Sequence, residues 1–260
     1  MTSRGSLGIA LGIVVAALAG SAGAESGLRL PYPRHFGAIP AATYDTDGKR
    51  VGAADLRVER LENGNVRIVS EIGFDDGART AAVALLAPID SGGALQLLSQ
   101  ESRSFDERGA PLGILRVDHR KRVASCHGVN NDGGAENVEL PDRDRVANVP
   151  LSLLFLPLAQ GHREAVKFQL FACRGSPRIL DFVARVATGN GSDPDLVKVR
   201  YGPDLGPVFS WIAKALIPRL AFWYERKSPS SWMASSGPLY AKGPVVVVIR
   251  AGVPASRLGP

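Results

Sequence analysis

The residues best suited to acid–base chemistry in this chain are its four histidines, His35, His119, His127 and His162. Their spacings form no HxH, HxxxH or HExxH pattern, so the sequence indicates no metal centre. Asp118 and His119 could form an acid–base pair in a hydrolase or isomerase, with His127 as a further base. The same pair also suits a turn between strands, and no serine lies in a G-x-S-x-G elbow. We therefore assign no catalytic residue and no cofactor.

The strongest indication of a binding function is a group of aromatic residues near the C-terminus. The segment 207–250 carries this group interleaved with basic residues: Phe209, Trp211, Arg219, Phe222, Trp223, Tyr224, Arg226, Lys227 and Trp232. Aromatic rings offer apolar area, Trp and Tyr add a polar tip, and arginine binds anionic groups. The pattern predicts a wall that binds a lipid or another amphiphile, made by Trp211, Arg219, Trp223, Tyr224 and Trp232. A hydrophobic core uses the same residue types and stays open as an alternative.

The two cysteines, Cys126 and Cys173, are predicted to form a disulfide. An isolated pair is most simply explained in this way in a protein of an oxidising compartment. Two unpaired thiols are one alternative, and a catalytic thiol of Cys126 activated by His127 is another. Adjacent residues in a strand point to opposite faces, so His127 is poorly placed to activate its neighbour.

Short strands must position these residues. Segments that alternate between apolar and polar residues recur between turn sequences, as at 51–61 and 66–72 on either side of Asn63–Gly64. The spacing predicts a mainly β fold, an antiparallel meander that forms a curved sheet or half-barrel. Five consecutive β-branched residues, Val245 to Ile249, predict a buried closing strand.

Helical signals are few and short. Leu151 to Leu156 is nearly all apolar and predicts one or two buried helical turns, with Pro150 in the first turn and Asn148 near the cap. Pro157 is expected to end these turns. A second apolar face, from Val208 to Leu216, predicts another short helix.

Residues 1–24 have the pattern of a secretory signal peptide. Arg4 supplies the positive start, Leu7 to Ala19 form an apolar stretch, and Ala22–Ala24 is a small-x-small cleavage site. The alternative, a membrane anchor, is disfavoured because the apolar stretch is short and interrupted by glycine. We expect cleavage after Ala24.

The expected mature chain, 25–260, is predicted to be a single β-rich domain without a transmembrane span. Ser21 stands where a bacterial lipoprotein would carry its lipid-bearing cysteine, so we expect a periplasmic or secreted protein that is not a lipoprotein. The net charge is +6, but no basic run is longer than Arg120–Arg122, which argues against nucleic-acid binding.

The order of these elements resembles a family of exported bacterial proteins described as a domain of unknown function. The shared features lie within Ala42–Arg185: a strand bearing Tyr44, a G-x-x-V-G hairpin with one residue displaced at Asp47–Gly52, a Leu-rich segment at Leu151–Leu158 and a strand at Val166–Phe171. The resemblance implies a curved antiparallel sheet that wraps a helix, similar in shape to periplasmic lipoprotein carriers. The family has no accepted catalytic residues, so the resemblance implies no site.

The leading interpretation is a non-enzymatic exported module that binds an apolar or amphiphilic envelope ligand between sheet and helix. The alternative is a structural or adaptor protein of the envelope whose exposed aromatic residues bind another protein. A hydrolase or isomerase that uses Asp118, His119 or His127 is the third interpretation, and it requires two of these side chains to converge in a cleft.

Overall fold

The computed structural model describes residues 28–89, 93–128, 136–141, 144–174, 176–188, 193–204, 220–227, 231–238 and 243–258. The expected signal peptide lies outside these ranges, and the expected single domain from 25 to 260 stays a prediction. Within these ranges, no helix has the length and apolar character needed to cross a membrane.

The described residues form one antiparallel sheet of 15 strands. The N-terminal strands are β1 Arg29–Pro31, β2 Gly37–Tyr44, β3 Arg50–Arg60, β4 Val66–Phe74, β5 Arg79–Pro88, β6 Ala94–Phe105, β7 Pro111–Asp118, β8 Val123–Gly128 and β9 Glu136–Glu139. The C-terminal strands are β10 Ala165–Arg174, β11 Ser176–Val186, β12 Leu196–Pro203, β13 Ala221–Glu225, β14 Trp232–Pro238 and β15 Val245–Arg250. The predicted mainly β fold is confirmed.

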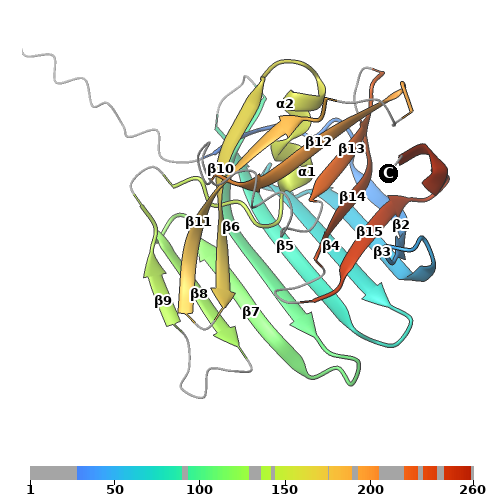
Figure 1. Cartoon of the computed structure of the whole chain (residues 1–260). Helices are drawn as coiled ribbons and strands as arrows, with labels where there is room; N and C mark the ends of the chain where they lie inside the picture. Colours follow the sequence, from blue (N-terminus) through green and yellow to red (C-terminus); the bar gives the residue numbers. More distant parts are fainter. Residues whose placement is uncertain are drawn as a thin grey trace, which may run out of the picture.

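Two meanders, β2 to β9 and β10 to β15, join into the single sheet through the pairing of β15 with β2. The predicted closing strand is therefore present as β15, and it links the C-terminal part of the chain to the N-terminal part. The sheet is strongly curved but does not close into a barrel by hydrogen bonds, so β9 and β10 end the strand order (Figure 1). Strand β1 lies off this path and pairs with β6.

Two short helices, α1 Leu151–Leu154 and α2 Leu156–Ala159, lie within the curve of the sheet (Figure 1). Their leucines and Phe155 pack into the main hydrophobic cluster. The predicted helical turns are present, but two details differ. Pro150 is the N-cap residue and not part of the first turn, and Pro157 stands in the first turn of α2, where its missing N–H costs nothing.

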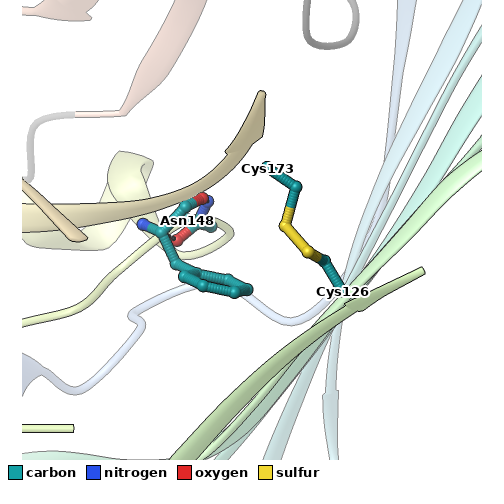
Figure 2. The surroundings of a disulfide bond; sticks show 4 residues. Cys126, Asn148 and Cys173 are labelled. Atoms are coloured by element: carbon teal, nitrogen blue, oxygen red, sulfur yellow. Dashed lines mark hydrogen bonds between the residues drawn. A yellow bond between two sulfur atoms is a disulfide. The ribbon is translucent and has the colours of Figure 1, made fainter. Parts of the chain in front are cut away.

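The two ends of the sheet are held together by a disulfide between Cys126 on β8 and Cys173 on β10, as Figure 2 shows. The predicted cysteine pair is thus present. Phe171 and Cys173 pack with Val117, Ala124 and Cys126 in a small cluster separate from the main one. Side-chain packing and one covalent bond therefore connect two strands that the hydrogen-bonded ladder leaves apart.

The segment that precedes α1 also secures this junction. Val146 forms a parallel bridge with Gln169 of β10, where Gln169 N donates to Arg145 O (2.8 Å) and Ala147 N donates to Gln169 O (2.9 Å). Asn148 lies near the helix start, as expected, two residues before the N-cap Pro150, but its side chain makes no cap and pairs with the backbone of Phe171. Its Nδ2 donates to Phe171 O (2.7 Å) and its Oδ1 accepts from Phe171 N (3.0 Å).

Candidate ligand-binding cavity

The curved sheet and α1 border a half-open cavity of about 450 Å³. Sites for small molecules in proteins have volumes of roughly 300–1,000 Å³ and are mostly apolar. Leu151 and Ser152 of α1 line it together with inward-facing residues of the sheet, from β2 and β15 on one side to β10 and β11 on the other. Many of these side chains are only half-buried although they belong to the interior of the fold, because they face this space.

The cavity exists because one stretch of the inner face carries small side chains. In the strand register, Ser70 of β4, Ala82 of β5 and Ser102 of β6 lie side by side in one row, and all three line the cavity. The next row but one, toward the helices, is also inward-facing and carries larger, buried side chains on two of these strands, Ile68 of β4 and Gln100 of β6. The change from close packing to small side chains along the same strands creates the space.

The opposite wall of the cavity is aromatic. Phe182 of β11, Tyr201 of β12, Phe222 of β13 and Trp232 of β14 all line it. The ring centroids of Tyr201 and Phe222 are 5.9 Å apart, and those of Phe182 and Tyr201 are 6.3 Å apart. Rings at these separations form a continuous apolar surface with favourable edge and tilted contacts.

Charged side chains are scarce among the lining residues that the structure describes. Asp55 is the one acidic residue of this set, but strand alternation directs it to the outer face, where it forms an ion pair with Arg57 (2.8 Å). The polar groups of the lining residues include the hydroxyls of Ser70, Thr80, Ser102 and Tyr201. The cavity therefore suits an apolar, uncharged molecule.

The structure separates the predicted ligand-binding residues. Trp232 lines the cavity. Tyr224 is fully buried beneath α1, where its hydroxyl donates to Ser152 O (2.9 Å). Trp223 points to the other face of the sheet, and its Nε1 donates to Leu258 O (3.0 Å) in a cluster with Met233. The roles proposed for Trp223 and Tyr224 in ligand binding stay predictions, but both side chains have a structural role.

The other two predicted residues, Trp211 and Arg219, lie outside the described residues, as does the short helix expected from Val208 to Leu216. Sequence reasoning missed Phe182 and Tyr201, which sit in ordinary alternating strands. A usable signal was the set of small residues at inward positions of β4, β5 and β6, since a packed core normally carries larger side chains there.

His119 belongs to a buried polar network and has a different partner from the one expected. Its Nδ1 bonds Asp144 Oδ2, not Asp118, and both side chains are about nine-tenths buried. Its Nε2 lies 3.2 Å from Gln100 Nε2, which also donates to Val146 O (3.0 Å). An amide nitrogen can only donate, so His119 Nε2 accepts, and the ring proton lies on Nδ1.

The third function considered, catalysis by these groups, requires convergence in a cleft. Asp118 Oδ1 accepts from the backbone N–H groups of Arg120 and Lys121 (both 3.0 Å). These bonds form a turn between strands, which was the alternative interpretation of the Asp118–His119 pair. His127 is exposed and faces away from the buried Cys126, as strand alternation predicts. Asp118, His119 and His127 thus serve separate local environments.

Comparison with known proteins gives a weak likeness in structure. Among solved structures, the chain is similar to a β-barrel-like protein of domain of unknown function DUF1849 from Brucella abortus, at 8% sequence identity and a TM-score of 0.36. The match covers 85% of this chain and 97% of that chain. That protein is described as β-barrel-like and of unknown function, as is the β-rich family that the sequence resembles. No protein-family model and no curated protein matches the chain.

Proposed function

We propose that the protein is a non-enzymatic exported module that binds an apolar or amphiphilic molecule inside its curved sheet. The observation that carries this proposal is the cavity of about 450 Å³ with one aromatic wall and one wall of small side chains. A protein of this size gains stability by filling its interior, so an open apolar space costs dispersion contacts that a ligand restores.

The disulfide supports an oxidising compartment for the folded protein. Disulfides persist in the periplasm and outside the cell, and they are rare in the cytosol. Here the bond between Cys126 and Cys173 connects the two ends of the sheet. Export fits a function in the envelope, where apolar and amphiphilic molecules must be kept out of water.

The proposal is tested by native mass spectrometry of the full-length protein expressed with its own N-terminal segment and purified from the periplasm without detergent. We expect a discrete adduct that solvent extraction removes and that belongs to one class of lipid or other apolar molecule. A mass without adduct, together with no uptake of added apolar probe, would contradict the proposal. The envelope adaptor would then be the better interpretation.

A further inference from the structure

Tyr201 offers a polar group to the cavity from a rigid position. Its ring centroid lies 5.3 Å from that of Phe155 and 6.0 Å from that of Phe168, so neighbours on several sides hold the ring in place. Its hydroxyl lies beside Gly237, where an added Cβ would approach it to 3.6 Å. Both residues line the cavity. The absence of a side chain at Gly237 leaves room next to the hydroxyl.

The hydroxyl of Tyr201 has no hydrogen-bond partner among the described residues, in contrast to that of Tyr224, which is bonded to Ser152 O. Burial raises the pKa of Tyr201 well above its usual value, so the group stays protonated. A protonated phenol in an apolar wall is a hydrogen-bond donor without an acceptor. Leaving such a group unpaired costs free energy, and an acceptor on a ligand removes that cost.

Trp232, on the same wall, also carries a polar group without a hydrogen-bond partner. Its indole Nε1 is buried and has no hydrogen-bond partner. Trp223 differs, because its Nε1 donates to Leu258 O. Buried Trp and Tyr side chains normally place their polar tips against a partner. The wall therefore contains two donors without a partner, the Tyr201 hydroxyl and the Trp232 indole nitrogen, the second of which is covered by neighbouring atoms. No cationic side chain is found among the described lining residues of the cavity.

We propose that the ligand is an uncharged amphiphile whose apolar body fills the cavity and whose carbonyl oxygen, as in an ester or ketone, accepts a hydrogen bond from the Tyr201 hydroxyl. This inference rests on the proposed function and specifies its ligand class. A carboxylate is a poorer occupant, because no described cation on the wall would offset the loss of its hydration. A pure hydrocarbon fits the apolar walls but leaves the Tyr201 hydroxyl unpaired.

The test compares undecan-2-one with undecane, which differ by one carbonyl oxygen, in the folded full-length protein. Binding is measured by displacement of the uncharged fluorescent probe N-phenyl-1-naphthylamine, for wild type and for Tyr201→Phe. We expect the substitution to weaken undecan-2-one binding about fivefold and to leave undecane unchanged, as one lost hydrogen bond predicts. For each of the two molecules, undecan-2-one and undecane, the affinity of wild type is compared with that of Tyr201→Phe. The different solubilities of the two molecules therefore cancel.

A second readout uses the wild-type protein alone. With ¹⁵N-labelled tryptophan, the Trp232 indole resonance is assigned by its loss in Trp232→Phe. We expect a larger shift of this resonance with undecan-2-one than with undecane, because only the ketone places a carbonyl dipole beside the aromatic wall to which Trp232 belongs. Equal shifts, together with an unchanged ketone affinity in Tyr201→Phe, overturn the inference while the cavity remains a binding site. If neither undecan-2-one nor undecane binds wild type, the proposed function itself fails.

Discussion

Replacing Cys126 and Cys173 together by alanine is expected to lower the free energy of unfolding by about 4 kcal/mol. The bond joins residues that are 47 positions apart, and without it the unfolded chain regains the entropy of that loop. The native state is affected as well. The two cysteines lie on strands near opposite ends of the sheet, which the ladder does not connect directly. Separation of these ends would also widen the cavity, because Cys173 lines it.

Urea unfolding at equilibrium measures this difference. Dithiothreitol serves as the control, since it should bring the wild-type protein close to the stability of the double variant and leave the double variant unchanged. The variant should also bind N-phenyl-1-naphthylamine more weakly. A loss below about 1 kcal/mol would mean that packing around Phe171 and the hydrogen bonds of 145–148 hold the junction without the covalent bond.

The second large effect is expected for Gln100→Leu, with a loss of about 3 kcal/mol or more. Gln100 is 4% exposed. Its Oε1 accepts from the backbone N–H groups of Asn148 (2.6 Å) and Val149 (3.1 Å), and its Nε2 donates to Val146 O (3.0 Å) and contacts His119 Nε2 (3.2 Å). The amide therefore uses both donors and both acceptor positions. Leucine keeps the volume but leaves several buried polar groups unpaired.

The matched control is Gln169→Leu, which lies on β10 beside the same segment. Its side chain bonds Asp181 Oδ1 (3.0 Å) and Arg145 N (3.3 Å) in exposed surroundings, where water replaces lost partners. We expect a loss below about 1 kcal/mol there. Chemical denaturation of both variants measures the loss in the free energy of unfolding for each. Equal losses for the two would show that the Gln100 network does not anchor the segment before α1.

The β meander could be predicted because its signals are local. Asn63–Gly64 indicated a hairpin turn, and it lies in the connection between β3 and β4. The connection is longer than the expected two residues, because Leu61 N donates to Asn65 O, and of the pair only Gly64 has a positive φ (+81°). The run Val245 to Ile249 indicated a buried strand, and it forms β15. Such features depend on neighbouring residues and on alternation, which the sequence displays directly.

The site could be predicted only in part because it depends on contacts between distant segments. Alternation places Trp223 and Tyr224 on opposite faces, but it does not tell which face is inside. The partner of His119 is Asp144, which reaches it through the segment before α1, and no local pattern announces that pairing. The role inferred for Tyr201 depends on Gly237, which is distant in the sequence and becomes its neighbour only in the folded protein.

The central claim is that the cavity is a binding site. The most direct test is a substitution on one strand that fills the cavity with a larger side chain. Ala82 of β5 lines the cavity, and its neighbour Ala81 points to the other face of the same strand. We expect Ala82→Phe to weaken the binding of N-phenyl-1-naphthylamine by at least about tenfold, which corresponds to 1.4 kcal/mol, because the new ring occupies the ligand's space. Ala81→Phe should bind the probe as wild type does. Equal affinity of the two variants in a fluorescence titration would contradict the account, because the probe would then bind outside the cavity.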